Sequence, residues 1–527
     1  MTFSDRGKLQ ININAANDYF AEIVQSTTTY GLEELSSCDQ SNDFEIEEVT
    51  NDQVFRKFQE IKDSSAGGCD DLSASVLKQI SRELAPYLTK IYNSSIRTSS
   101  VPLSWKKANV KILWKGKGKK DDPSNYRPIS VLPIMARVFE KLVAEQMYSF
   151  CDVMEIIPSQ QFGFRKHSSC ETALISATNN WMKEIDDGNI VGALLIDLSK
   201  AFDSVPHDKL LAELLKIGCS NKSLGWFRSY LTDRHQRVLE RPNSTEWKDV
   251  SRGVPQGSCL SPLLFNIFVR EIPSICKTDT YQYADDITQS QSGKDVSHVV
   301  DSLSKSFEIT KQFCDNKNLA INTKKTQFLI MHAQGKRISE DIEILIGEET
   351  LKPVKSVKLL GVTIDRYLTF GPHIDTIISK ANSLLHMLSK ASVMLPTALL
   401  RTVYISLVRA HLESCSAVWA SAASSHLHRI DVVQKRAVRI IMNKPRDTHS
   451  APLEKTLKLD SLESRRHNHI INIVRKCLLN DYNPALDGLF NWCPTNDHII
   501  YNKSCRINLG KRRFENFAGE LFERKFC

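Results

Sequence analysis

The chain has 527 residues, of which 41% are hydrophobic and 25% are charged. These fractions are typical of a globular protein and exclude both a disordered chain and a collagen-like fibre. The 69 Lys and Arg residues exceed the 61 Asp and Glu residues, which gives a formal net charge of +8. A chain of this length favours several packed subdomains over a single core.

The cysteines and the N-terminal residues indicate where in the cell the protein is expected. None of the thirteen cysteines belongs to a C-x-x-C pair, which disfavours a zinc ribbon and a disulfide framework and favours reduced thiols. The N-terminal sequence MTFSDRGKLQ lacks the pattern of a signal peptide. No apolar run reaches the roughly 18 residues that a transmembrane helix needs. We therefore expect an intracellular protein of the nucleus or cytoplasm that is not secreted and does not span a membrane.

The first part of the chain predicts short helices. Residues 1–60 are acidic and polar, with a helical pattern around residues 19–23. Residues 64–73 (SSAGGCDDLS) predict a turn that caps a helix, because Asp and Ser side chains accept hydrogen bonds from the first amides of a helix. Apolar residues then recur at helical spacing at Leu72, Val76, Leu77 and Ile80.

Positive charge is concentrated in the next segment. Residues 101–127 hold seven Lys and one Arg against two Asp, so this stretch alone carries a net charge of +6. It contains a short apolar run at 110–114, followed by KGKGKKDDPSNYR at 115–127, which Gly, Pro and charge mark as a loop. A basic loop of this kind either contacts a polyanion or is a solvated face, and the residues alone leave both interpretations open.

The middle of the chain predicts a buried layer. The sequence IVGALLIDL at 190–198 is almost entirely aliphatic, which is typical of a strand covered on both faces. Helices are predicted over 134–147 and, as a buried one, over 262–272, and residues 252–257 predict a turn. Residues 281–288 (YQYADDIT) favour a β-hairpin with two carboxylates at its tip. After about residue 340 the pattern becomes helical, including an amphipathic helix over 430–442.

Three carboxylates stand out in this layer. Asp197 ends the most hydrophobic strand, where an ionised group needs a compensating cation. Asp285 and Asp286 are adjacent like charges, which also repel unless a cation lies near them. The three could converge on one site for Mg²⁺, which prefers hard oxygen ligands and also binds substrate phosphates. An isolated Asp-Asp pair is more often a solvated turn, as we interpret Asp121-Asp122, but the flanking aromatic and β-branched residues favour the metal site.

Seven short motifs follow one another along the chain: NYRPIS at 125–130, QFGFR at 161–165, DLSKAFD at 197–203, GVPQGS at 253–258, YADD at 283–286, NxxKT at 322–326 and LLGV at 359–362. Their order resembles the reverse transcriptases of non-LTR retrotransposons, most like the jockey-type elements of animals. The flanking sequences Gly68-x-Asp70 and QKRA at 434–437 also fit this family. The resemblance covers roughly residues 55–480.

The resemblance implies an α+β fold, a right-hand polymerase with fingers, a palm of antiparallel sheet plus helices, and a helical thumb. The domains we expect are an N-terminal extension at 1–60, fingers and palm at 61–340, the palm end and helical thumb at 341–445, and a basic helical region at 446–527. Stretches before and after the polymerase motifs are too short for a nuclease or ribonuclease H domain, so we expect endonuclease function to come from elsewhere.

The implied activity is RNA-directed DNA polymerisation by two-metal nucleotidyl transfer. Its partners would be an RNA template, a DNA primer and deoxynucleoside triphosphates, and its cofactor two Mg²⁺ ions, with Mn²⁺ as an alternative. By resemblance, the metal ligands are Asp197, Asp285 and Asp286, and Lys325 is the lysine that protonates pyrophosphate. An exposed loop lysine is the alternative interpretation of Lys325.

Other residues are assigned to substrates by the same resemblance. Arg127 and Arg165 would contact the triphosphate, Phe202 would exclude a ribose 2′-hydroxyl, and Gln256 and Gly257 would lie against nucleotide and template. The alternatives are a core aromatic at Phe202, a structural turn at Gln256-Gly257 and a solvated Arg165. Nucleic-acid contacts are expected from the loop and the later helix, at Lys115, Lys117, Lys119, Lys120, Lys435, Arg436 and Arg439, with solvated faces as the alternative.

Competing functions have specific tests in the sequence. A nucleotide cyclase shares the palm but has no use for the fingers motifs, and an RNA polymerase should select the ribose hydroxyl that Phe202 would exclude. A catalytically decayed relic that only binds nucleic acid is the remaining alternative. The presence of all three aspartates argues against it.

Overall fold

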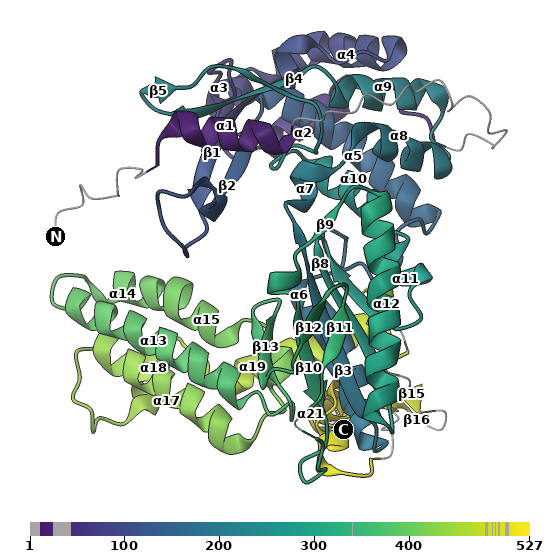
Figure 1. The fold of residues 1–527 in the computed structure, drawn as a ribbon. Coiled ribbons are helices and arrows are strands. Elements are labelled where there is room, and N and C mark those ends of the chain that lie inside the picture. Colours follow the sequence, from purple (N-terminus) through teal and green to yellow (C-terminus); the bar gives the residue numbers. More distant parts are fainter. Residues whose placement is uncertain are drawn as a thin grey trace. The chain divides into compact units, whose positions relative to one another are not determined.

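The computed structural model describes residues 11–24, 44–339, 341–479, 483–486, 488–490, 492–493, 496–500 and 505–526. The chain divides into two compact units that interleave along the sequence (Figure 1). Unit one comprises residues 1–158, 198–272 and 311–321, and unit two comprises 159–197, 273–310 and 322–527. Both units mix helices and sheet, as the α+β prediction requires. The predicted domain boundaries at 60, 340 and 445 remain predictions.

Unit one contains a sheet with the strand order β2-β1-β4-β5, in which β6 also pairs with β4. The strands are β1 (Lys107–Trp114), β2 (Tyr126–Val131), β4 (Arg234–Glu240), β5 (Asn243–Ser244) and β6 (Lys248–Val250). β1 is antiparallel to β2 and parallel to β4. The apolar run predicted at 110–114 is therefore part of strand β1, and the basic loop connects β1 to β2. The predicted loop ends two residues earlier than expected, because Tyr126 and Arg127 already belong to β2.

Helices pack around this sheet. They are α1 (Ile13–Val24), α2 (Asn51–Gln59), α3 (Ala74–Gln79), α4 (Ser81–Thr98), α5 (Ile134–Val153), α7 (Ala201–Ser204), α8 (His207–Lys216), α9 (Asn221–Leu231) and α10 (Ser261–Phe268). Part of the core is aromatic: the Tyr92 ring stacks on Phe139 at 4.5 Å, and Trp226 meets Phe139 edge-on at 5.4 Å. Such contacts add to the stabilisation from burial alone.

Three details in unit one differ from the prediction. Ser73 precedes α3 but makes no capping hydrogen bond, because its hydroxyl lies 2.8 Å from that of Ser75. The helix predicted over 262–272 ends as α10 at Phe268, and a separate short helix, α11 (Ile272–Ile275), follows. Of the four apolar residues predicted to face the core near α3, only Leu77 is buried.

Unit two is built on a second sheet, with the order β10-β3-β8-β7 and antiparallel pairing throughout. The strands are β3 (Ile190–Ser199), β7 (Asp279–Tyr283), β8 (Asp286–Gly293) and β10 (Gln327–Met331), and the two-residue β9 (Ala320–Ile321) pairs with the end of β3. The predicted strand and the predicted hairpin are both present, as β3 and β7–β8.

Helices cover both faces of this central strand. A Cβ atom added at Gly192 would lie 2.7 Å from Val299 and 2.8 Å from Leu303, so α12 (Val296–Asn316) packs directly on β3 there. The neighbouring residues Val191 and Ala193 point to the opposite face and share a core with α6 (Cys170–Asp186). The aliphatic run therefore reflects burial on both sides, as predicted.

The prediction of helices from residue 340 onward is wrong for the first 25 residues. Two short hairpins precede the helices, β11 (Ile344–Ile346) with β12 (Glu349–Leu351) and β13 (Ser356–Leu359) with β14 (Val362–Asp365). Gly347 and Gly361 allow their tight turns, because both have positive φ, 60° and 92°. Strands this short give too few alternations to be recognised from sequence.

Helices then dominate. They are α13 (Gly371–Ala391), α14 (Thr397–Val403), α15 (Ala410–Glu413), α16 (Ser416–Trp419), α17 (Ser424–Ile441), α18 (Ser450–Thr456), α19 (Leu462–Leu478), α20 (Asn508–Lys511) and α21 (Phe514–Phe526), with a small pair β15 (Trp492–Cys493) and β16 (Asn496–Ile500) before the last two. α17 contains the predicted amphipathic helix. Within the described ranges, no helix combines the length and apolarity required to cross a lipid bilayer.

Candidate active site

The three predicted aspartates lie at one end of the unit-two sheet. Asp197 is near the end of β3, and the antiparallel register places it directly opposite Asp286, the first residue of β8. Cβ atoms of directly opposed residues lie about 5 Å apart on one face of a sheet. Asp285 occupies the tip of the β7–β8 hairpin, after Ala284, whose φ of 55° turns the chain back. The structure thus brings together carboxylates that are 88 positions apart in sequence.

Lys325 joins this group. It lies in the short 3₁₀ turn η4 (Thr323–Lys325), and its Nζ atom is 2.9 Å from Oδ2 of Asp197. The turn itself is tied to the same strand end, because the Asn322 amide donates to the Asp197 carbonyl at 2.8 Å. The exposed ammonium group therefore balances one of the three carboxylates.

Asp286 lies in an unfavourable environment for a negative charge. Burial and the negative charges of Asp285 and Asp197 together raise its pKa to about 6, although Lys325 lowers it. A cation placed among these groups would relieve both effects, since it stabilises the ionised forms.

The aspartates suit a metal by chemistry rather than by a closed ligand cage. No three His, Cys, Asp or Glu side chains in the described ranges are gathered tightly enough to hold a metal ion. The donor atoms, however, are carboxylate oxygens with incomplete charge compensation, which are the ligands that Mg²⁺ prefers when it also retains water and substrate oxygens. The residues present therefore fit a divalent cation of this kind.

A second group of predicted residues lies within unit one, on α7 and the turn at 253–258. The Gln256 Nε2 atom lies 2.9 and 3.0 Å from the two carboxylate oxygens of Asp203, so the amide is fixed by that contact. The neighbouring Phe202 ring stacks on the buried Phe265 ring at 4.5 Å and remains partly exposed. The contact with Phe265 agrees with a core role for Phe202, and its role toward a substrate stays a prediction.

The glycines of this turn are required by close backbone approach. A Cβ atom at Gly253 would lie 2.7 Å from the Asp203 carbonyl oxygen, and one at Gly257 would lie 2.6 Å from that of Ser130. Gly257 also has a φ of 118°, which L side chains rarely adopt. The Ser130 amide donates to the Gln256 carbonyl at 2.7 Å, so the turn is fastened to β2, which carries the exposed Arg127.

Sequence reasoning missed two carboxylates that support this turn. Asp203 lies inside a quoted motif but was given no role, although it holds Gln256. Glu140 on α5 is buried, and its two oxygens accept from the Tyr230 hydroxyl at 3.0 Å and the Cys259 amide at 3.2 Å. Burial raises the pKa of Glu140. Its position among apolar residues of a helix was the available signal, because a buried Glu is rare without a partner.

The predicted basic residues of the loop 115–125 are all exposed, but not all are equally free to bind. Lys115 donates to the Ser124 carbonyl at 2.7 Å, and the Lys120 ammonium lies over the Trp114 ring at 5.2 Å. Lys117 and Lys119 have no ion pair among the described residues. Arg165 is half-buried in unit two, directly after Phe164, whose φ is 54°.

Two of the three predicted basic residues of α17 make hydrogen bonds within unit two. Arg439 donates to the Thr448 carbonyl at 2.7 Å and to the Lys435 carbonyl at 3.2 Å. Arg436 is exposed and donates to Asn382 of α13 at 2.8 Å, and Lys435 is half-buried. Of the three, Arg436 is the most accessible.

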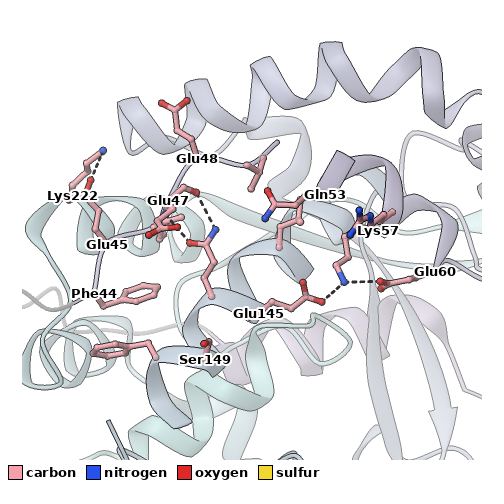
Figure 2. A pocket seen from close by; sticks show the side chains of 16 residues that line it. Phe44, Glu45, Glu47, Glu48, Gln53, Lys57, Glu60, Glu145, Ser149 and Lys222 are labelled. Carbon is pink, nitrogen blue, oxygen red and sulfur yellow. Dashed lines mark hydrogen bonds and ion pairs between the residues drawn. The ribbon is translucent and has the colours of Figure 1, made fainter. Parts of the chain in front are cut away.

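A separate groove of about 1120 Å³ lies in unit one, lined by residues 44–49, α2 and α5 (Figure 2). Its charges are largely satisfied internally: Lys57 pairs with Glu145 at 2.5 Å and Glu60 at 2.7 Å, and Lys222 pairs with Glu45 at 2.7 Å. It contains none of the residues predicted from the motifs.

Part of the chain matches a known protein family. The profile of the family described as reverse transcriptase (RNA-dependent DNA polymerase) matches residues 117–364. Residues 117–364 are a reverse transcriptase domain. This domain contains Arg127, Arg165 and all the other predicted catalytic and substrate residues, whereas Lys115 and the three basic residues of α17 lie outside it.

Three similar proteins are transposon proteins of Drosophila melanogaster. The chain is 28% identical to the probable RNA-directed DNA polymerase from transposon BS (80% of this chain, 48% of that protein). It is 26% identical to the probable RNA-directed DNA polymerase from transposon X-element (77% and 45%) and 25% identical to the RNA-directed DNA polymerase from mobile element jockey (80% and 47%). The recognition of a jockey-like element is confirmed, and the chain spans about half the length of these relatives.

Proposed function

We propose that the chain is an RNA-directed DNA polymerase of a non-LTR retrotransposon, which extends a DNA primer on an RNA template. The observation that carries this proposal is the pairing of Asp197 with Asp286 beside the hairpin tip at Asp285, within the reverse transcriptase domain. The substrates are deoxynucleoside triphosphates, and the products are the extended primer and pyrophosphate.

In this proposal Asp197, Asp285 and Asp286 hold two Mg²⁺ ions, with Mn²⁺ as an alternative. When bound, such ions lower the barrier to attack of the primer 3′-hydroxyl on the α-phosphate and neutralise the charge on the departing pyrophosphate. The raised pKa of Asp286 supports the assignment, because its ionised form requires a neighbouring cation.

Lys325 has two successive tasks in this scheme. Its ammonium group holds Asp197 in place through the 2.9 Å contact in the free protein. Because it is exposed and beside the carboxylates, it is also placed to donate a proton to pyrophosphate. Both tasks require a cationic group beside the carboxylates, which Lys325 provides.

The proposal also assigns residues that bind the nucleotide, the template and the primer. Arg127 on β2 matches a triphosphate through paired guanidinium hydrogen bonds. Gln256 and Gly257 form a rigid turn against which base and template can lie, and Phe202 covers the sugar. Arg165 contacts the triphosphate, and Lys115, Lys117, Lys119, Lys120, Lys435, Arg436 and Arg439 contact the phosphates of the template and primer.

The test is primer extension by the purified chain on a synthetic RNA template annealed to a DNA primer. We expect extension with deoxynucleotides and Mg²⁺, and none when the metal is chelated by EDTA. A chain that binds the template–primer duplex but adds no nucleotide with either Mg²⁺ or Mn²⁺ would contradict the proposal and favour a decayed relic.

A further inference from the structure

The segment 160–163 runs beside β7 at the edge of the unit-two sheet. The Phe162 amide donates to the Gln282 carbonyl, and the Gln282 amide donates to the Gln160 carbonyl, both at 2.8 Å. These bonds form an isolated parallel bridge between Gln161 and Gln282. The segment is thereby attached to the strand that leads into the hairpin tip.

The Gln161 side chain reaches the tip itself. Its Oε1 atom accepts from the amide of Gly163 at 2.9 Å and from the amide of Ala284 at 3.0 Å. Ala284 is the residue with a φ of 55° that immediately precedes Asp285. One carbonyl oxygen therefore joins two segments that are more than 120 positions apart and fixes the residue at which the hairpin turns.

The close approach of the two segments depends on Gly163. A Cβ atom at this position would lie 2.4 Å from the Ala284 nitrogen, a distance that no real Cβ contact shows. The absence of a side chain at 163 thus allows the Gln161 oxygen to lie between the two amides.

This arrangement is poorly explained by stability alone. Gln161 and Gln282 are each only 1% exposed, and the Nε2 atom of Gln161 and both amide atoms of Gln282 have no hydrogen-bond partner among the described residues. A buried polar atom without a partner is destabilising, which offsets what the two hydrogen bonds of Gln161 contribute. What the glutamine supplies in return is a defined position for the tip.

We propose that Gln161 is a positioning residue that holds the hairpin tip, and with it Asp285, in one conformation. This inference rests on the proposed function of the aspartates. Gln161 touches neither substrate nor metal in this scheme. It acts through the Ala284 amide, and a preorganised carboxylate is worth more to catalysis than one that must be ordered during the reaction.

The first test measures the tip directly in the protein without metal or nucleic acid. Gln161→Met keeps the length and volume of the side chain but removes the acceptor. We expect hydrogen exchange in a peptide covering residues 283–287 to become at least tenfold faster, because the Ala284 amide loses its partner. Gln282→Met is the matched control, since it replaces an equally buried glutamine that makes no side-chain bond to the tip, and it should leave that exchange rate unchanged.

The second test measures catalysis. In primer extension, Gln161→Met should lower kcat at least tenfold and raise the Mg²⁺ concentration for half-maximal rate, with the affinity for the template–primer duplex unchanged. Gln282→Met should match the wild type. If the methionine variant at 161 gives no cooperative unfolding transition, Gln161→Asn replaces it, because its shorter side chain cannot reach both amides.

The outcomes separate the two claims. Unchanged exchange at residues 283–287 in a folded Gln161 variant overturns the positioning role, whatever the activity. Equal loss of protection in the Gln282 control also overturns it, since the effect would then be general loosening. A wild-type chain without extension activity contradicts the proposed function, while faster exchange at the tip would still support the role of Gln161.

Discussion

Phe202 has a core contact that is observed and a substrate role that is proposed. Its ring stacks on the buried Phe265 at 4.5 Å and keeps one part exposed. The backbone of Phe202 is also held in place, because the Val254 amide donates to the Phe202 carbonyl at 2.8 Å. Both contacts restrict the ring, as the proposed exclusion of a 2′-hydroxyl requires.

Phe202→Val should open space beside the sugar and allow ribonucleotides to be incorporated. We expect discrimination between deoxynucleotides and ribonucleotides on the same RNA template to fall at least tenfold, about 1.4 kcal/mol of differential transition-state stabilisation. Comparison of kcat/KM for the two nucleotides measures it. Phe139→Leu, a core change within the aromatic cluster, should lower stability without changing sugar choice. Unchanged discrimination in a folded Phe202 variant would assign the ring to the core alone.

Asp203 gives a second prediction at this scale, for stability against pH. Burial raises the pKa of Asp203 to about 6 from an ordinary value near 3.8, and the Gln256 hydrogen bond opposes the shift. A carboxyl with a raised pKa in the folded state binds its proton more tightly there, so protonation stabilises the fold. That stabilisation is complete below about pH 4 and is lost as the pH rises through about 6.

As the pH rises from 5 to 8, the loss of the proton from Asp203 should lower the free energy of unfolding by about 1.4 kcal/mol. Asp203→Asn should remove that part of the decline, and denaturant unfolding at the two pH values measures it. The exposed Asp301→Asn should behave as the wild type does. Identical declines in the Asp203 variant and the wild type would show that Asp203 is not the group responsible.

At the scale of elements, the strand β3 and the hairpin β7–β8 could be predicted, whereas the long-range contacts that support them could not. An aliphatic run and an aromatic hairpin with two acids are local patterns, and both are present where they were expected. Gln161 and Glu140 act on amides 123 and 119 positions away, and a single sequence carries no signal for such contacts. Their residue types show only that something polar must be buried nearby.

The basic loop between β1 and β2 carries a prediction about salt. Lys117 and Lys119 are exposed and can bind phosphates directly. Lys115 would first have to give up its hydrogen bond to the Ser124 carbonyl. Replacing Lys117 and Lys119 with Gln should reduce the slope of log affinity against log salt by about 1.5, since each phosphate contact contributes roughly 0.7–0.9. The template–primer affinity measured from 50 to 300 mM KCl gives this slope.

The control is a double variant that removes the same number of positive charges outside the loop. Lys62 and Lys90 are also exposed and have no ion pair among the residues described, and replacing both with Gln should leave the slope within error of the wild type. An equal reduction in both double variants would mean that net charge, rather than the loop, sets the salt dependence. An unchanged slope in both would make the loop a solvated face.

At the scale of the whole molecule, the class of fold was predicted from the motifs, and the interleaving of two compact units was not among the predictions. Motifs in a fixed order identify a reverse transcriptase domain, and residues 117–364 match that family. The two units interleave, because the chain leaves unit one at residue 158, returns at 198 and again at 311. Linear boundaries drawn from composition cannot represent such crossings, and strands of three or four residues, such as β11–β14, leave too little periodicity to read.

The central claim is that Asp197, Asp285 and Asp286 form the reaction centre, and substitution of single aspartates tests it most directly. Asp197→Asn and Asp285→Asn keep the size of each side chain and remove the charge that would hold a divalent cation. Primer extension on an RNA template with Mg²⁺ should fall by at least a thousandfold in each, while template–primer affinity stays within about twofold of the wild type. Asp301→Asn should extend the primer normally. Near-wild-type extension by either active-site variant would place the reaction centre elsewhere in the chain.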